Sequence, residues 1–225
     1  MSSNSHINLY ASLISDDPSL IFQHLPIFEE CGLSGLHFDV MDGSFVPRLG
    51  LYPELLSSIR DHSKLPIEVH LMMLEPIKYI DQFINLGADR VLVHYENLEN
   101  PESVLDQIAS LGAQPGIVLN PETNFLNLEN LLDRTQLIML MAINPGIPRH
   151  PFIPSILDKL INLRLWLDQI KPSVEIGIDG GVTLENAMTL NNSGANWLVC
   201  GSGTIFKPGK SLTDNIDDVL KALKK

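Results

Sequence analysis

Short apolar segments recur along the whole chain, and longer segments with a helix-like pattern separate them. Runs that are short and continuously apolar are typical of parallel strands buried on both faces. The expected strands are residues 7–13, 35–40, 67–71, 90–94, 116–119, 137–143, 174–178 and 197–200. The expected helices are residues 18–31, 53–61, 76–86, 101–111, 125–133, 154–170, 183–193 and 212–224. The pattern therefore predicts eight strands that alternate with eight helices.

Proline and glycine mark the ends of these expected helices. Several begin with proline at or near the first helical position, where no backbone N–H is needed. Gly32, Gly87, Gly112 and Gly194 follow helices at C-cap positions. An alternating α/β chain of this length fits one (β/α)₈ TIM barrel, a single domain over residues 1–225. The alternative, an open doubly wound sheet, lacks its usual G-x-G-x-x-G motif after the first strand.

Composition and charge narrow the class of partner. The hydrophobic content of 44% predicts a sizeable core, and the net charge of −12 argues against nucleic acid or an anionic membrane. The two cysteines, Cys31 and Cys200, lie in apolar surroundings and are expected to be buried thiols in a reducing compartment. Residues 1–6 are polar, and no apolar run reaches the ~18 residues of a membrane helix. We therefore expect a cytoplasmic protein whose partner is a small molecule.

Two histidines and two aspartates fall near the carboxyl ends of expected strands. His37 and Asp39 lie two positions apart and therefore share one strand face. His70 and Asp179 lie at the ends of the third and seventh strands. In a TIM barrel these strand ends converge on one mouth, where active sites are built. The set predicts a mixed nitrogen and oxygen site for one Zn²⁺, Fe²⁺ or Mn²⁺ ion.

Each member of this set also has an ordinary structural interpretation. A lone strand-end histidine is commonly a structural residue, and a strand-end aspartate can cap the next helix. All four residues on one face of the barrel favour a functional site. Two opposed carboxylates beside a Lewis acid suit proton removal next to a carbonyl group. Asp39 and Asp179 are therefore the candidate catalytic residues.

Further candidate residues surround this set. Met41, Met72 and Met141 lie at or just beyond strand ends, where they could wall a dry pocket or simply fill the core. Glycine-bearing turns follow the last two strands, and in TIM barrels these loops commonly bind phosphate through backbone N–H groups, although ordinary turns also favour glycine. Gly146 begins a loop expected over the mouth. Arg149 in that loop could reach a phosphate or could be solvated.

Ordered motifs give the chain a resemblance to the ribulose-phosphate 3-epimerase family over nearly its full length. The D-V-M-D-G-x-F-V-P string at residues 39–47 is highly specific. The other matching segments are Ser12-Leu13-Ile14-Ser15, His37-Phe38, Glu68-Val69-His70-Leu71-Met72, His94-Tyr95-Glu96, Leu119-Asn120-Pro121-Glu122-Thr123, Met141-Ala142-Ile143-Asn144-Pro145-Gly146, Phe152-Ile153-Pro154, Asp179-Gly180-Gly181-Val182 and Gly201-Ser202.

The resemblance implies an isomerase of the ribulose-phosphate-binding barrel type. Such an epimerase interconverts D-ribulose 5-phosphate and D-xylulose 5-phosphate in the pentose phosphate pathway. In the family one divalent ion per subunit is held by residues matching His37, Asp39, His70 and Asp179. The matching Asp39 and Asp179 are the acid–base pair: one removes the C3 proton, the ion steadies the cis-enediolate oxygens, and the other returns a proton from the opposite side. Residues matching Ser12, His70 and the three methionines line the pocket, and amides matching Gly180, Gly181, Gly201 and Ser202 hold the phosphate.

Two departures from the family pattern keep alternatives open. Residues 147–151 lack the glycines and glutamine usual in the loop after Gly146, and the turn at residues 201–206 is one residue longer than usual. The longer turn resembles that of allulose 6-phosphate epimerases, so a hexulose phosphate is the alternative substrate. A non-catalytic sugar-phosphate binding protein is a second alternative, although it would not need two opposed carboxylates. Related decarboxylases need a D-x-K-x-x-D array, which residues 70–75 do not provide. Relatives form dimers or hexamers, so we expect a homo-oligomer.

Overall fold

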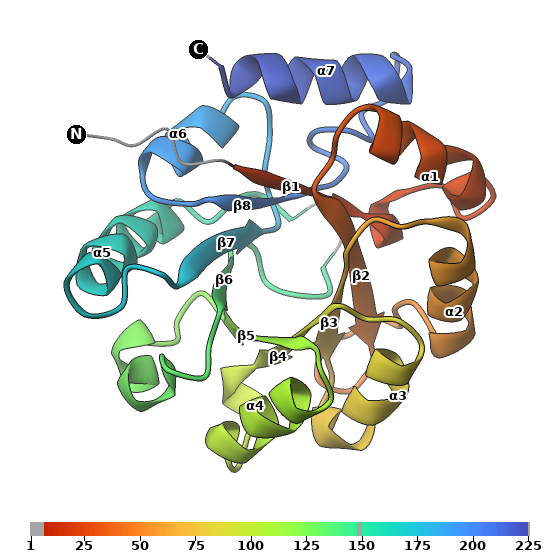
Figure 1. Cartoon of the computed structure of the whole chain (residues 1–225). Coiled ribbons are helices and arrows are strands. Elements are labelled where there is room, and N and C mark those ends of the chain that lie inside the picture. Colours follow the sequence, from red (N-terminus) through yellow and green to blue (C-terminus); the bar gives the residue numbers. More distant parts are fainter. Residues whose placement is uncertain (1–6, 148–149, 225) are drawn as a thin grey trace.

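The strands close into a parallel barrel in chain order, with β1 paired to both β2 and β8. The computed structural model describes residues 7–147 and 150–224. Figure 1 shows the ring of strands surrounded by helices, with the strands viewed from the end at which they begin. The strands are β1 (Asn8–Ser12), β2 (Gly35–Met41), β3 (Ile67–Met72), β4 (Arg90–His94), β5 (Gln114–Leu119), β6 (Leu137–Met141), β7 (Glu175–Asp179) and β8 (Trp197–Cys200). The predicted (β/α)₈ TIM barrel is confirmed, and every strand ends within two residues of its predicted bounds.

Helices and short 3₁₀ segments form the outer layer. The helices are α1 (Ile21–Glu30), α2 (Pro53–His62), α3 (Ile80–Asn85), α4 (Pro101–Ser110), α5 (Ser155–Ile170), α6 (Ala187–Asn192) and α7 (Leu212–Ala222). The 3₁₀ segments are η1 (Leu13–Ser15), η2 (Pro76–Lys78), η3 (Tyr95–Asn97) and η4 (Phe125–Leu131). The four glycines predicted to close helices have φ values of 76°, 108°, 90° and 113°, which confirms their C-cap role.

The prediction of an α-helix at residues 125–133 is wrong, because this segment forms the 3₁₀ helix η4. Leu128 and Leu131 are buried, and Phe125 packs against the core. These residues are spaced by three, and one turn of a 3₁₀ helix contains three residues, so they share one face. Asn124 caps the segment by accepting a hydrogen bond from the backbone N–H of Leu126 at 3.0 Å. A spacing of three along the buried face therefore matches the tighter helix.

Three other helices are shorter than expected. The segment from Pro18 forms a turn before α1 begins, and the expected helix at residues 76–86 divides into η2 and α3. Before α6, the backbone N–H of Thr183 donates to Asn186 Oδ1 at 2.8 Å, and the backbone N–H of Asn186 donates to Thr183 Oγ1 at 3.3 Å. Such side-chain bonds compete with helical ones, so α6 begins only after them.

Alternation along the strands separates a helix-facing core from the barrel interior. In β2, Phe38 and Val40 belong to the large apolar cluster under the helices, whereas Met41 belongs to a small cluster near the barrel mouth. In β8, Trp197 faces a cluster inside the barrel, and Cys200 faces the helices. Cys200 is buried as expected, but Cys31 is only partly buried; both are free. The interior is thus packed with side chains and offers room only at its ends.

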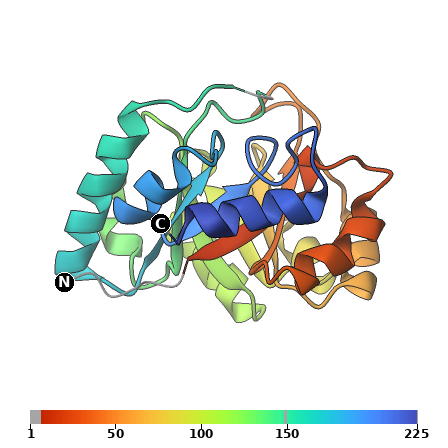
Figure 2. The same cartoon turned by 90° about the horizontal axis from the view of Figure 1, so that it is seen from above.

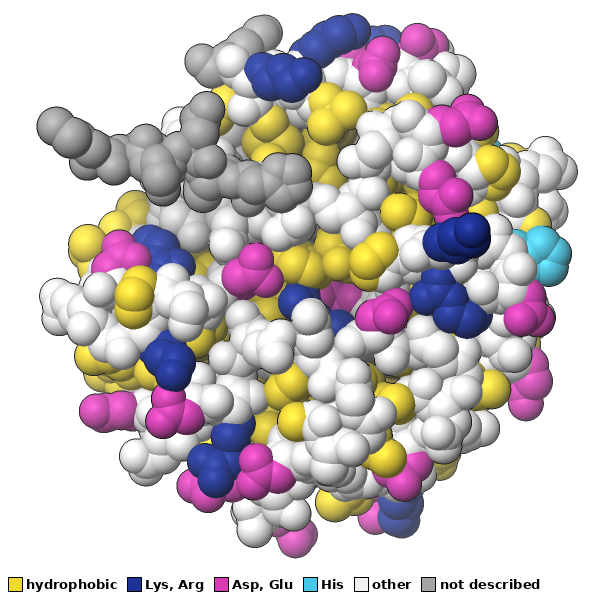
Figure 3. All heavy atoms as spheres, viewed as in Figure 1, with side chains coloured by type: hydrophobic (Ala, Val, Ile, Leu, Met, Phe, Trp, Pro, Cys, Tyr) yellow, Lys and Arg dark blue, Asp and Glu magenta, His cyan; other side chains and the backbone are white. Residues whose placement is uncertain are grey.

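The open end of the barrel lies where the strands finish. Figure 2 shows the loops after β2 and β6 meeting above this end. They touch at Gly146, where an added Cβ would lie 2.5 Å from Val46 Cβ. Figure 3 shows the opposite end, where basic and acidic side chains gather near the centre of the face. Within the described parts of the chain, none of the helices has the length and apolar character needed to cross a bilayer.

Candidate active site

Two imidazoles and two carboxylates converge inside the barrel from β2, β3 and β7. The β2–β3 register places Asp39 opposite His70, and Asp179 is the last residue of β7. The Nε2 atom of His37 lies 3.1 Å from Asp39 Oδ1 and 3.7 Å from Asp179 Oδ2. The Nδ1 atom of His70 lies 3.6 Å from Asp39 Oδ1 and 3.4 Å from Asp179 Oδ2. Each carboxylate therefore faces both imidazoles.

The donor set fits one divalent cation. One ligand atom from each of the four residues can be chosen so that all lie within 4.8 Å of one another. Both imidazoles are fully buried, whereas the side chains of Asp39 and Asp179 are 5% and 13% exposed. His70 Nδ1 is buried and has no hydrogen-bond partner among the described residues, which is costly for a polar atom unless a ligand binds it. Two imidazole nitrogens with two carboxylate oxygens suit Zn²⁺, Fe²⁺ or Mn²⁺.

The carboxylates also change the protonation of the imidazoles. Burial lowers the pKa of His37, but Asp39 and Glu68 outweigh burial and raise this pKa well above its usual value. The pKa of His70 is likewise raised by Asp179 and Asp39 against the effect of burial. Burial raises the pKa of Asp39, yet His37 and His70 hold that pKa well below its usual range. Without a metal, the site therefore favours protonated imidazoles beside an ionised Asp39.

Metal affinity is expected to rise as the pH rises from about 6 to about 8. A cation can bind His37 and His70 only after their protons leave, and the raised pKa values keep those protons bound at lower pH. Competition with a chelator of known affinity measures the dissociation constant for Mn²⁺ across this range. Calorimetry in buffers of different ionisation enthalpy counts the protons released. An affinity that does not change with pH would contradict coordination by these two imidazoles.

Hydrogen bonds from neighbouring strands orient two of these residues. Glu68 Oε1 lies 2.7 Å from His37 Nδ1 and accepts a hydrogen bond from it, which leaves His37 Nε2 to face the site. The hydroxyl of Ser12 donates to Asp39 Oδ2 at 3.2 Å. Glu68 Oε2 in turn lies 3.5 Å from Arg90 Nη1, and the Arg90 guanidinium stacks 4.0 Å from the ring centre of Trp197. Fixed contacts thus connect the site to the barrel end shown in Figure 3.

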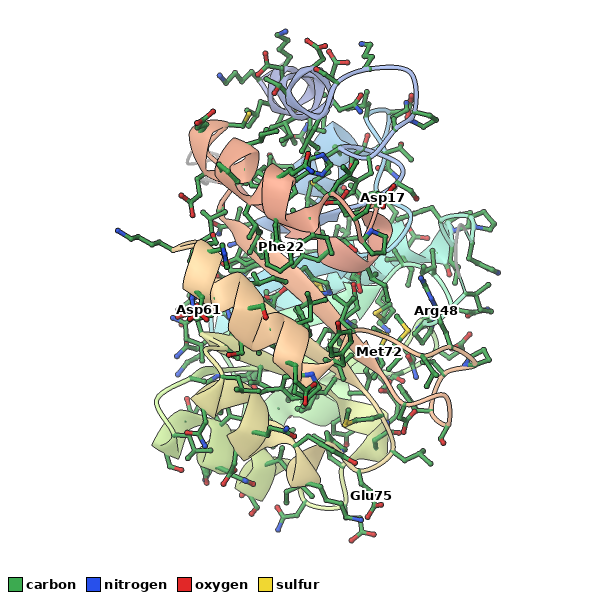
Figure 4. All side chains as sticks on the ribbon, turned by 90° about the vertical axis from the view of Figure 1, so that its right-hand side faces the viewer. Asp17, Phe22, Arg48, Asp61, Met72 and Glu75 are labelled. Carbon is green, nitrogen blue, oxygen red and sulfur yellow. The ribbon has the colours of Figure 1, made fainter. Side chains whose placement is uncertain are left out.

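A cavity of about 600 Å³ opens at the carboxyl ends of the strands. Both candidate catalytic residues, Asp39 and Asp179, line it. The other predicted residues on its wall are Ser12, Met41, Met72, Met141, Gly146, Gly180, Gly181, Gly201 and Ser202. Figure 4 shows Met72 and Arg48 on the side of this mouth, with Asp61 toward the other end. Arg149 was also predicted to contact substrate, but it lies outside the described residues.

The cavity wall also contains residues that the sequence did not single out. Arg48 is the sole arginine or lysine on the wall among the described residues. Arg48 directly follows the family-specific motif at residues 39–47, and this position was the only sequence feature that could have marked it as a site residue. Asn186 lines the cavity too, and its Nδ2 donates to the carbonyl oxygen of Gly181 at 2.9 Å. Asn186 therefore holds the glycine turn after β7 in place, a contact that joins residues five apart and that no periodic pattern signals.

The barrel, its cavity and the four-residue donor set define a TIM-barrel protein with a candidate metal centre at the usual catalytic end. The chain belongs to the ribulose-phosphate 3 epimerase family, whose sequence model matches residues 8–206. The resemblance inferred from the motifs is thereby confirmed.

Named relatives cover most of the chain. A ribulose-phosphate 3-epimerase of Synechocystis is 38% identical over 207 residues, which are 91% of this chain and 90% of that protein. A chloroplastic ribulose-5-phosphate-3-epimerase of Arabidopsis thaliana is also 38% identical, over 89% of this chain and 72% of that protein. The Bacillus subtilis ribulose-phosphate 3-epimerase is 36% identical over 87% of this chain and 91% of that protein.

Solved structures of low identity share the fold. A mutant tryptophan synthase α-subunit from Pyrococcus furiosus superposes with a TM-score of 0.70 at 17% identity, over 96% of this chain and 97% of that one. A structure described as native KDPGal superposes with a TM-score of 0.65 at 15% identity, over 100% of this chain and 98% of that one. At such identities the likeness extends to the barrel alone.

Proposed function

We propose that the protein epimerises D-ribulose 5-phosphate and D-xylulose 5-phosphate at C3. Membership of the epimerase family supports the reaction class. The observation that carries the proposal is the placement of Asp39 and Asp179, which both line the cavity and both face the same two imidazoles. Inversion of a carbon centre needs a proton acceptor on one face and a donor on the other, because one group reaches only one face.

His37, Asp39, His70 and Asp179 would hold the divalent ion. When bound, the ion supplies positive charge beside the ketose carbonyl, where negative charge develops as the C3 proton leaves. Ser12 holds one oxygen of Asp39 through its hydroxyl, so that carboxylate keeps a fixed orientation. One aspartate takes the C3 proton, and the other delivers a proton to the opposite face.

The three methionines would keep water away from the reacting carbon. Met41, Met72 and Met141 are the last residues of β2, β3 and β6, and these residues are 8%, 1% and 2% exposed. An apolar wall strengthens the electrostatic interactions within the site and protects a carbanion-like species from stray protonation. Their polarizable thioethers also adapt to substrates of slightly different shape.

The turns after β7 and β8 would hold the phosphate. Gly180 and Gly181 have φ values of 90° and 65°. Residues with a side chain rarely adopt such positive φ values, so glycine allows a backbone turn here that other residues would disfavour. Gly201 passes so close to η1 that an added Cβ would lie 2.9 Å from Ser15 Oγ. Backbone N–H groups in such concave turns bind anions. Contrary to the usual barrel pattern, turn structure rather than a helix follows Gly201 directly.

Gly181→Ala is expected to raise the KM for the phosphorylated substrate about tenfold to a hundredfold with a smaller effect on kcat, because it disturbs one anion-binding turn. The added Cβ would lie 2.9 Å from Phe152 Cα at a positive φ. Gly32→Ala is a matched control: its φ is 76°, and its Cβ meets no atom within 4 Å. Steady-state kinetics of both variants test the assignment. Equal KM values for Gly181→Ala and Gly32→Ala would remove Gly181 from the phosphate site.

The cell compartment and the assembly are proposed from the sequence. Cys31 and Cys200 are both free, which supports the proposed reducing, cytoplasmic environment. The proposed homo-oligomer, a dimer or a hexamer, stays a prediction.

The function is tested by comparing ribulose 5-phosphate with allulose 6-phosphate, on protein reconstituted with Fe²⁺, Mn²⁺ or Zn²⁺. Faster turnover of the pentulose supports the proposal. Preference for the hexulose would assign the altered loop at residues 147–151 and the longer turn at residues 201–206 a role in specificity. Binding without turnover of either sugar, in protein that holds the metal, would favour a non-catalytic binding protein.

A further inference from the structure

A third buried histidine touches the candidate metal centre from outside it. The Nε2 atom of His94, the last residue of β4, lies 2.9 Å from the Nε2 atom of His70. The two ring planes are inclined by only 16° and their centres lie 5.0 Å apart, so the rings meet at their edges, as a hydrogen bond between the two nitrogens requires. His94 is fully buried, and Phe45 covers it with a ring centre 4.8 Å away. Neither metal binding nor proton transfer, as proposed above, uses this residue.

We propose that His94 and Glu96 are positioning residues that fix the tautomer of His70, so that its Nδ1 lone pair faces the metal. The inference rests on the proposed metal role of His70.

The contacts from His70 through His94 to Glu96 determine which ring nitrogen carries each proton. Between two nitrogens 2.9 Å apart, one must donate and the other accept. A metal bound at His70 Nδ1 requires that the single ring proton sit on His70 Nε2, so His94 Nε2 must accept it. The proton of neutral His94 then lies on Nδ1, which is 3.3 Å from Glu96 Oε2. The opposite order would place a proton on His70 Nδ1, pointing at Asp39 and Asp179 and blocking the metal.

Glu96 sets the direction of this chain because an ionised carboxylate can only accept. Its Oε1 accepts the backbone N–H of Asn120 at 2.7 Å and the hydroxyl of Thr123. Burial raises the pKa of Glu96, but hydrogen bonds from His94 and Thr123 outweigh burial and lower this pKa to about 2. The side chain is 21% exposed, so it joins the buried rings to the loop after β5 near the protein surface. Both ligand histidines are thus tied to a carboxylate, His37 directly by Glu68 and His70 through His94.

The test measures metal affinity in chelator-treated protein and does not depend on turnover. His94→Phe keeps an aromatic ring but cannot accept the His70 proton, so we expect Zn²⁺ affinity to fall about tenfold to a hundredfold. His94→Gln offers an amide oxygen to His70 Nε2 and should retain most of the affinity. Glu99→Gln removes an exposed carboxylate from the segment between β4 and α4, which also contains Glu96. This variant is the control and should bind Zn²⁺ as the wild type does. Wild-type affinity in His94→Phe would overturn the proposal, whatever the substrate proves to be.

A second measurement uses the wild-type protein and so survives poor folding of the variants. Long-range ¹H–¹⁵N spectra of the zinc-loaded protein report which nitrogen of each histidine ring is protonated. We expect His94 to be protonated at Nδ1 and bare at Nε2. A proton on His94 Nε2 would overturn the proposal, because His70 could then no longer donate to it.

Discussion

Asp179→Asn is expected to lower the rate of epimerisation by at least about a thousandfold, the upper part of the range for losing a general acid–base group. In the proposed mechanism an amide could neither take the C3 proton nor return one, so one face of the substrate would lose its proton-transfer group. Asp179 closes β7 at the cavity wall, and the helix-facing core is built from other, apolar residues. The variant should therefore keep its barrel and its melting temperature near that of the metal-free wild type. Direct assay of both sugar phosphates with excess metal measures the loss.

Asp61→Asn is the matched control, because Asp61 is an exposed carboxylate of α2 at the other end of the molecule (Figure 4). It should leave the rate unchanged. Deuterium exchange at C3 refines the result, since Asp39 remains intact in Asp179→Asn. Exchange into one epimer without inversion would show which face Asp179 serves. Full turnover in the variant would contradict a mechanism that uses two acid–base groups.

The barrel and the donor set were predictable because each depends on a simple periodicity. Parallel strands buried on both faces are short and apolar, so their ends are visible where a polar residue follows, as at Asp179. The alternation of strand side chains is enough by itself to place His37 and Asp39 on one face. The 3₁₀ helix η4 was misjudged because spacings of three and of three to four look alike over so few turns.

The supporting contacts could not be predicted, because they join residues whose distance depends on register. His94 is one more histidine at a strand end, and only the ring separation of 5.0 Å gives it a partner in His70. Glu68 alternates with His70 in β3, but the bond to His37 needs the β2–β3 pairing. Arg48 lies in a loop, where no periodicity tells which side chains reach the cavity.

If the proposed metal is bound, its removal is expected to abolish the proposed epimerisation and to lower the melting temperature without unfolding the protein. The two aspartates carry no positive charge that could offset the enediolate of the proposed mechanism. The barrel should persist because its main apolar cluster packs β-strands against helices away from the four ligands. A ligand that binds only the folded state stabilises it by about 2.7 kcal/mol at a hundred times its dissociation constant. Chelation, followed by assays of rate and melting temperature, should show both losses, and added Mn²⁺, Fe²⁺ or Zn²⁺ should reverse them.

His37→Gln separates a specific metal effect from a general one. This variant loses one of the proposed imidazole ligands, so its melting temperature should no longer respond to added metal, and its activity should stay low. His62→Gln is the control, because His62 is exposed at the end of α2 and should leave both responses intact. Undiminished turnover in wild-type protein shown by elemental analysis to hold no metal would contradict the prediction. The acid pair would then have to act with charge from the protein alone, and the cationic imidazoles of His37 and His70 would be its source.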